Sequence, residues 1–305
     1  MKRIYLDHNI FIKCLEDSSF IDSLCDYYNK DILVFYYGPA HMEEIYRVES
    51  DINSPYRNDM KKLRKIIEQI TQCNEILPAN DGLKFVKEPT RFPYDRIKKY
   101  DTTELIAYSS IEKYGIDHDH YKKMLEMDKN NRQISNLSFS DIWNHSVIQA
   151  IINEFNEKKD KVIFAYNNSM DMLISALICG QMRILPEDFC IKKDNYKLVL
   201  KQSFDQLEYT IEFLMRVLNY CGYNAEKTKR TAISGTHDVT HCIYATVTDC
   251  IITMDQRFFK KCKAIYYYLG VDTRVVYCNN IEEIKDVIKQ LYNEGMNEMK
   301  ILSHT

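Results

Sequence analysis

The stretch that decides the fold opens the chain: Lys2-Arg3-Ile4-Tyr5-Leu6-Asp7-His8-Asn9-Ile10-Phe11-Ile12. Its β-branched and aromatic residues favour a strand over residues 3–6. The strand runs into the carboxylate of Asp7, and an apolar segment compatible with a helix follows. An open α/β sheet gathers its reactive groups at the carboxyl ends of its strands. Asp7 is therefore the first candidate site residue, unless it serves only as a turn or cap residue.

A second strand is predicted a short distance further along the chain. Residues 32–37 form a continuous apolar run, typical of a buried parallel strand. Gly38-Pro39 ends that run, and proline suits the first turn of a helix, here over residues 40–49. Helical spacing of apolar residues also fills the chain between the two strands. This alternation of strands and helices predicts an α/β fold with a parallel sheet.

The remaining elements follow from the same periodicities and from the positions of Gly, Pro and polar clusters. We expect helices over residues 60–73, 100–114, 121–127, 142–155, 162–184, 197–221, 237–246, 256–269 and 281–292, strands over 250–253 and 273–277, loops over 78–93 and 128–133, a chain break at 233–236 and a loose tail over 295–305. Both ends of the chain are thus α/β, and the middle is mainly helical. We divide it into a core of residues 1–54 and 231–292, a helical insertion of residues 55–230 and a tail of residues 293–305.

The composition narrows the class of protein. The chain has 305 residues, of which 45% are hydrophobic and 28% are charged, with a formal net charge of −3. It has ten cysteines without a C-x-x-C pair, so zinc-site spacing is missing and reduced thiols in the cytoplasm are expected. The N-terminus does not resemble a signal peptide, and no apolar run has the length needed to cross a bilayer. We therefore expect a cytoplasmic protein with no membrane partner.

Acidic residues from separate segments are the candidates for a shared site. Glu43 and Glu44 lie on the helix after the second strand, about 100° apart, so one of them is expected to face the site. Asp238 is expected at a helix N-terminus, where capping alone would also favour an aspartate. His241 lies one turn further along the same helix face, where it would support a ligand or simply pack.

The strand over residues 250–253 separates two further aspartates by geometry. An extended chain rises about 3.3 Å per residue, which places Asp249 and Asp255 about 20 Å apart at opposite ends of the strand. Asp255 is at the same end as Asp7 if the strands are parallel, so Asp255 is assigned to the site and Asp249 to a structural role. Carboxylate oxygens suit Mg²⁺ and Mn²⁺, and two such ions can activate water for phosphodiester hydrolysis.

Three stretches together resemble the motifs of PIN-domain nucleases. Tyr5–Phe11 resembles their opening strand with its Asp-x-Asn, Gly38–Ile45 resembles their second motif, and Asp238 through Phe258 resembles their closing motif with Thr-x-Asp. The resemblance covers roughly residues 1–50 and 230–292, and the helical insertion exceeds a minimal PIN domain. It implies a PIN-like α/β/α core in which the metal is bound by four acids: Asp7, Glu44, Asp238 and Asp255. It also implies supporting roles for Asn9 and Thr253, and it prefers Glu44 to Glu43.

The function expected from this resemblance is that of an Mg²⁺- or Mn²⁺-dependent endoribonuclease. Arg257, Lys260 and Lys261, downstream of Asp255, would neutralise the phosphates of the RNA. A protein inhibitor or a second copy of the chain would be a further partner. Two alternatives stay open: a nuclease for single-stranded or branched DNA, and a catalytically silent PIN-like binding module. No Ser-His-Asp arrangement, G-x-x-x-x-G-K-[ST] loop or G-x-G-x-x-G fingerprint points to another enzyme class.

Overall fold

A computed structural model of the protein describes residues 1–79, 82–98, 134, 136–158, 190–194, 204–224 and 229–302. The expected helices over 100–114, 121–127 and 162–184, the break at 128–133 and the start of the helix expected over 197–221 lie outside these residues. With η for short 3₁₀ helices, the elements in chain order are β1 (Lys2–Leu6), α1 (His8–Glu16), α2 (Ser18–Tyr27), β2 (Leu33–Tyr36), α3 (Pro39–Ser50), η1 (Arg57–Asp59), α4 (Met60–Thr71), β3 (Asn74–Ala79), β4 (Gly82–Lys87), η2 (Asp141–Asn144), α8 (Ser146–Lys158), α11 (Phe204–Tyr220), α12 (Lys229–Tyr244), η3 (Ala245–Val247), β5 (Cys250–Thr253), α13 (Gln256–Leu269), β6 (Arg274–Tyr277) and α14 (Ile281–Leu302).

The centre of the molecule is a four-stranded parallel sheet in the order β2-β1-β5-β6. Strand β1 therefore lies between a neighbour from the start of the chain and one from its end. The backbone N–H of Asp7 extends this pairing by donating to Ile252 O at 3.0 Å. The predicted α/β fold with a parallel sheet is confirmed, and the carboxyl ends of β1 and β5 lie side by side.

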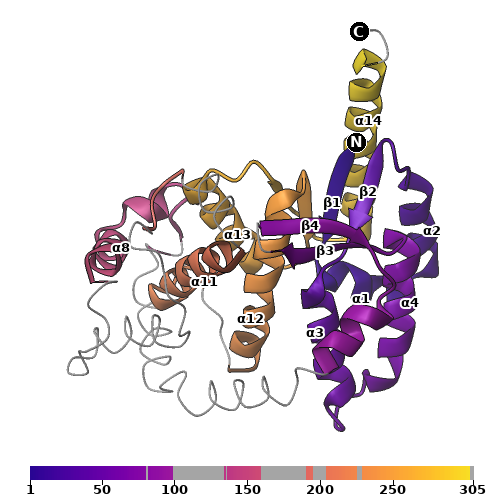
Figure 1. Ribbon diagram of the computed structural model, residues 1–305, viewed down its shortest axis with the longest axis horizontal. Helices are drawn as coiled ribbons and strands as arrows, with labels where there is room; N and C mark the ends of the chain where they lie inside the picture. Colours follow the sequence, from indigo (N-terminus) through magenta and orange to yellow (C-terminus); the bar gives the residue numbers. More distant parts are fainter. Residues whose placement is uncertain are drawn as a thin grey trace.

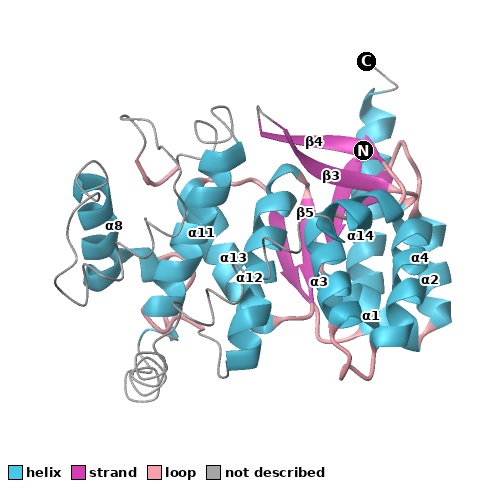
Figure 2. Cartoon of the chain, turned by 60° about the horizontal axis from the view of Figure 1, so that its bottom comes forward, coloured by secondary structure: helices cyan, strands magenta, loops and turns pink. Residues whose placement is uncertain are grey.

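Helices cover both faces of the sheet, as Figure 2 shows. Ile4 and Leu6 point from β1 into a core formed with α1, α2, α4 and α14. Tyr5, between them, points to the opposite face and into a core formed with α8, α11, α12 and α13. This alternation is what a strand buried on both faces requires. None of the described helices is long and apolar enough to cross a membrane.

The expectation of a loop over residues 78–93 is wrong. Residues 78–93 contain β4, which pairs with β3 as an antiparallel hairpin; residues 91–98 are helical. The hairpin joins the sheet edge at β2, because Tyr37 donates to Asn74 O at 3.1 Å and accepts from the N–H of Ile76 at 2.8 Å. The alternating apolar pattern around the Asn-Asp-Gly turn signal could have predicted the hairpin.

The tail is also helical, since α14 continues to Leu302 and extends beyond the sheet beside the N-terminus (Figure 1). The expectation of a loose tail is therefore wrong for residues 295–302. A Cβ at Gly295 would lie 2.7 Å from Ile32 O, so a glycine lets the helix pass the start of β2. Lys2 Nζ lies 2.6 Å from Glu298 and ties this extension to the first strand.

Candidate functional site

Thr253 connects the ends of the two central strands. Its Oγ1 donates a hydrogen bond of 2.6 Å to Asp7 Oδ2, and it accepts one of 2.9 Å from the N–H of Asp255. Asp7 directly follows β1, and Asp255 stands two residues beyond β5. The structure thus brings Asp7, Thr253 and Asp255 together at the carboxyl edge of the sheet, as the strand geometry predicts.

Asp7 is held rigidly and buried at this edge. Its Oδ1 caps α1 by accepting from the N–H of His8 at 2.7 Å, and its Oδ2 also accepts from Asn9 Nδ2 at 3.2 Å. Asn9 therefore orients Asp7, as expected. Burial raises the pKa of Asp7, and the nearby His241 and the Thr253 hydrogen bond offset this only in part.

Asp255 is fixed by the start of α13. Its Oδ1 accepts from the N–H groups of Arg257 and Phe258 at 2.7 and 2.9 Å. Two hydrogen bonds at a helix N-terminus hold this carboxylate in one position. Asp249 lies at the opposite end of β5, where its Oδ2 accepts from the N–H of Arg3 at 2.6 Å. The prediction that Asp249 has a structural role, away from the site, is confirmed.

Asp238 does not stand at a helix N-terminus, which corrects the sequence interpretation. Helix α12 begins at Lys229 and runs unbroken through residues 233–236. Glycine in a helix interior costs only about 1 kcal/mol, and the packing of α12 against α3, α11 and α13 outweighs that cost. Capping therefore does not explain the presence of Asp238.

The pKa of Asp238 depends on the charges of the two aspartates at the strand ends. Burial raises the pKa of Asp238 to about 8, the charge of Lys261 opposes the rise, and the charges of Asp7 and Asp255 add to it. The charges of Asp7 and Asp255 therefore reach the carboxyl group of Asp238, which places Asp238 within electrostatic range of the two strand ends.

A histidine side chain lies between Glu44 and Asp7. His241 Nε2 lies 2.8 Å from Glu44 Oε1 and 3.8 Å from Asp7 Oδ1, so the imidazole stands between the two carboxylates. A carboxylate only accepts, so Nε2 carries a proton. Burial lowers the pKa of His241, but the hydrogen bond to Glu44 and the charges of Asp7 and Glu44 raise it above its ordinary value. His8 and His241 in turn hold the pKa of Glu44 well below its usual range, against the effect of burial.

A hydrogen-bonded anchor fixes the helix that carries Glu44. Burial lowers the pKa of His41, so its ring is neutral. His41 Nδ1 accepts from the N–H of Gly38 at 3.1 Å, which leaves Nε2 to donate to Leu6 O at 2.8 Å. This pair of contacts fastens the first turn of α3 to the end of β1 and so sets the position of Glu44 beside Asp7.

Sequence reasoning missed three residues around His241. The hydroxyl of Tyr5 lies 2.9 Å from His241 Nδ1, on the side away from Glu44. His237, one turn before His241, lies 3.5 Å from Glu43 through Nδ1, and His41 fixes α3. Each of the two glutamates on α3 therefore lies beside one of the two histidines on α12. The spacing of His237 and His241, four residues apart on one helix, is a signal that could have found this pairing.

The basic residues expected to bind phosphates differ in their surroundings. Lys261 is 0% exposed, and its Nζ donates to Asn219 Oδ1 at 3.2 Å. Its charge acts on Asp238 from inside the protein, so the expectation that Lys261 contacts nucleic acid is wrong for this structure. Arg257 and Lys260 lie half-buried on α13, and their role as phosphate ligands stays a prediction.

The side-chain oxygens at this edge of the sheet match a hard divalent cation in their chemical type but not in their arrangement. Within the described segments, no group of three or more His, Cys, Asp or Glu side chains is arranged to hold a metal ion. The aspartate oxygens of Asp7, Asp238 and Asp255 are nevertheless the donor type that Mg²⁺ and Mn²⁺ prefer, and the raised pKa of Asp238 is what a nearby cation would lower. The Glu44 oxygen is already engaged by His241.

Comparisons with protein-family models, with curated proteins and with solved structures found no match. The resemblance to PIN-domain nucleases therefore stays a prediction.

Proposed function

We propose that the protein is a metal-dependent nuclease of the PIN type, with the core in residues 1–54 and 231–292 and RNA as its substrate, cleaved endonucleolytically. The observation that carries the proposal is the position of Thr253, whose hydroxyl links Asp7 and the backbone of Asp255 at one sheet edge. Asp238 supports it, because its pKa responds to both of these carboxylates. Asp7 and Asp255 each cap a helix, but capping does not explain the carboxylate of Asp238.

Within this proposal, each residue has a defined task. The carboxylates of Asp7, Asp238 and Asp255 would hold Mg²⁺ or Mn²⁺, which supplies an activated water and neutralises developing negative charge. Thr253 and Asn9 orient Asp7 through its Oδ2. His241 holds a proton at Nε2 against Glu44 and keeps that carboxylate ionised beside Asp7. We assign substrate selection to the helical insertion of residues 55–230.

The direct test is cleavage of labelled single-stranded RNA, with a DNA strand of the same sequence in parallel. We expect cleavage of RNA with Mn²⁺ or Mg²⁺ and its loss on chelation. The double variant Asp7→Asn, Asp255→Asn should be inactive yet folded by circular dichroism, and Asp249→Asn should stay active. Undiminished cleavage by the double variant would sink the assignment, and preferential cleavage of DNA would move the substrate to single-stranded DNA.

One observation favours a second candidate, a catalytically silent PIN-like binding module. The described residues contain no preassembled metal-binding group, and Glu44 is paired with His241 instead. Calorimetry with Mn²⁺ distinguishes the two candidates. Heat of binding and a raised melting temperature on adding Mn²⁺ support the nuclease, whereas the absence of both supports the silent module.

A further inference from the structure

The side chains at the carboxyl edge of the sheet differ in how firmly each is held. Within the described part of the chain, Asp7 accepts three hydrogen bonds, and Asp255 accepts two from backbone N–H groups at the start of α13. Glu44 accepts a single one, and its donor is His241 Nε2 at 2.8 Å. Of these three carboxylates, Glu44 is therefore the one that becomes free to move when one contact is lost.

The histidine that holds Glu44 is itself fixed from its other side. The hydroxyl of Tyr5 lies 2.9 Å from His241 Nδ1, and both side chains are buried. A tyrosine hydroxyl donates to Nδ1 of a neutral imidazole and accepts from Nδ1 of a charged one, so Nε2 carries a proton in both cases. His241 is therefore a donor toward Glu44 whether or not its ring is charged.

The same nitrogen also lies beside Asp7. His241 Nε2 is 3.8 Å from Asp7 Oδ1 and 2.8 Å from Glu44 Oε1. A magnesium ion binds its oxygen ligands at about 2.1 Å, so an ion that bound Asp7 and Glu44 together would crowd this N–H group. While His241 holds Glu44, the described residues contain no group of three or more His, Cys, Asp or Glu side chains arranged to hold a metal ion.

We propose that His241 competes with the divalent cation for Glu44. The cation binds the Glu44 carboxylate only after the hydrogen bond from His241 Nε2 to Glu44 Oε1 breaks. This inference rests on the metal-dependent nuclease proposed above, and it adds Glu44 to the three aspartates as a ligand. Its consequence is a lower affinity for the metal than the four acids alone would give.

The helices around Glu44 can stay in place during this exchange. Glu43 Oε2 lies 3.5 Å from His237 Nδ1, so a second pair of side chains still connects α3 and α12 when Glu44 leaves His241. His41 fastens the first turn of α3 to the end of β1. A rotation of the Glu44 side chain is therefore sufficient, and its cost is one hydrogen bond to a charged acceptor. Such a bond contributes roughly a factor of ten or more to an equilibrium.

The direct measurement is the affinity for Mn²⁺ by calorimetry, at one fixed pH, on protein freed of metal by chelation. His241→Leu fills the buried position without a hydrogen-bond donor, and it should bind Mn²⁺ about tenfold more tightly than the unaltered chain. His241→Gln is the matched control, because its amide can still donate to Glu44, and its affinity should stay near that of the unaltered chain. In a Glu44→Gln background, His241→Leu should leave the affinity unchanged, since its effect acts through the carboxylate.

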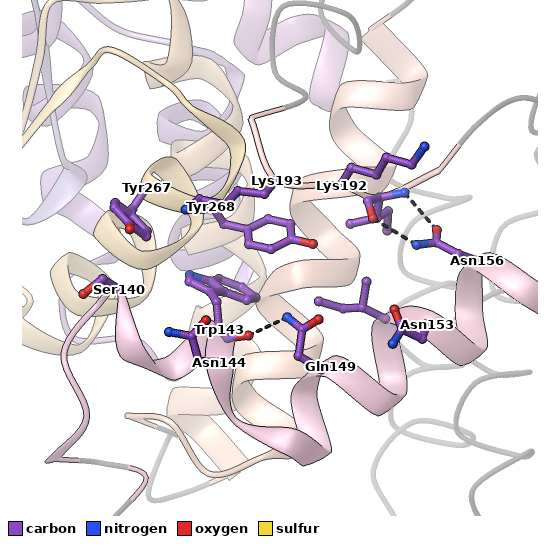
Figure 3. Close-up of a pocket in the computed structure, with 12 residues that line it drawn as sticks. Ser140, Trp143, Asn144, Gln149, Asn153, Asn156, Lys192, Lys193, Tyr267 and Tyr268 are labelled. Carbon is purple, nitrogen blue, oxygen red and sulfur yellow. Dashed lines mark hydrogen bonds between the residues drawn. The ribbon is translucent and has the colours of Figure 1, made fainter.

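The single tryptophan reports whether each variant is folded. Trp143 is buried, and its Nε1 donates to Ala264 O on α13 at 2.8 Å, beside a pocket of about 430 Å³ at the other end of this helix from Asp255 (Figure 3). Helix α13 packs against α12, which carries His241. An emission spectrum equal to that of the unaltered chain therefore shows that a variant has kept the packing of α13.

The unaltered chain offers a second measurement that needs no substitution. His241 is 1% exposed, so its Nε2 proton should exchange slowly with water and be visible in proton–nitrogen NMR spectra. Adding Mg²⁺ should shift this resonance, because Glu44 leaves the imidazole.

The outcomes separate this inference from the nuclease function. An affinity of His241→Leu that is equal to or weaker than that of the unaltered chain, or a gain that persists with Glu44→Gln, overturns the competition. RNA cleavage with an unmoved His241 resonance defeats the competition alone. A shifted resonance and a tighter His241→Leu variant without any RNA cleavage defeat the nuclease proposal alone, and no Mn²⁺ binding by any variant defeats both.

Discussion

The Thr253 hydroxyl donates to Asp7 Oδ2 at 2.6 Å and accepts from the backbone N–H of Asp255 at 2.9 Å. One side chain thereby sets the relative positions of two carboxylates that are 248 positions apart in the sequence, since 255 − 7 = 248. Thr253 is 0% exposed, so water cannot replace either hydrogen bond if the hydroxyl is removed.

Thr253→Val keeps the shape of the side chain and removes the hydroxyl. We expect a loss of about 1–3 kcal/mol in the free energy of unfolding, because Asp7 Oδ2 and the Asp255 N–H each lose a buried partner. The pKa of Asp7 should rise further, since the Thr253 hydrogen bond lowers it. Urea unfolding measures the first effect and carboxyl NMR the second. Thr253→Ser retains the hydroxyl and should resemble the unaltered protein; equal losses for both variants would contradict the role of the hydroxyl.

The two ends of β5 should respond differently to the same substitution. Asp249→Asn alters an exposed contact with the Arg3 N–H and should cost at most about 1 kcal/mol of stability. Asp255→Asn removes a carboxylate from the candidate site. We expect RNA cleavage to be kept by the first variant and lost by the second, as measured on one labelled strand. Equal losses of activity would refute the separation of the strand ends.

The parallel sheet could be predicted from the sequence, because strands that are buried on both faces carry continuous apolar runs, as in β2 and β5. It failed at α12, where Gly235 was interpreted as a break. Local propensity favours a break at that glycine, and the contacts of α12 with α3, α11 and α13 override it. The hairpin β3–β4 was missed because Pro and polar residues obscured its short alternating pattern of apolar residues.

The candidate site was predictable only where it depends on strand ends. Asp7 and Asp255 followed from parallel-strand geometry, and Asn9 from its short spacing. The insertion of His241 between Glu44 and Asp7 depends on how α12 packs against α3, which no local pattern encodes. The burial of Lys261 is likewise a packing outcome, because lysine on a basic helix is ordinarily exposed.

The charge of Lys261 should control the pKa of Asp238. The Lys261 charge lowers the pKa of Asp238, which nevertheless lies near 8. Lys261→Met removes that charge with little change in volume, and such replacements of buried charges are often tolerated. We expect the pKa of Asp238 to rise by about one unit or more, measured by carboxyl NMR. Lys260→Met, on the adjacent half-buried position, should leave it near 8, and a shift of similar size there would contradict a specific pair.

Glu75 provides a pH dependence far from the acidic site. Its carboxylate is buried on β3, with Arg96 Nη2 at 3.2 and 3.3 Å from its two oxygens. Arg96 also donates to Glu88 at 2.6 Å, so one guanidinium serves two acids. Burial raises the pKa of Glu75 to about 8, and the charge of Arg96 offsets this only in part.

The free energy of unfolding should therefore fall as pH rises between about 4.5, the ordinary pKa of the carboxyl, and about 8, its value in the folded protein. In that range the folded state keeps a proton that the unfolded chain has lost, so the contribution of Glu75 is complete below 4.5 and gone above 8. Glu75→Gln should make this slope shallower and raise stability at the alkaline end by on the order of 3 kcal/mol, and the slope that is left belongs to groups such as Asp238, whose pKa is also about 8. Urea unfolding at several pH values measures it, with Glu282→Gln on the exposed start of α14 as the control. A slope that is as steep in Glu75→Gln as in the unaltered protein would contradict the contribution of Glu75.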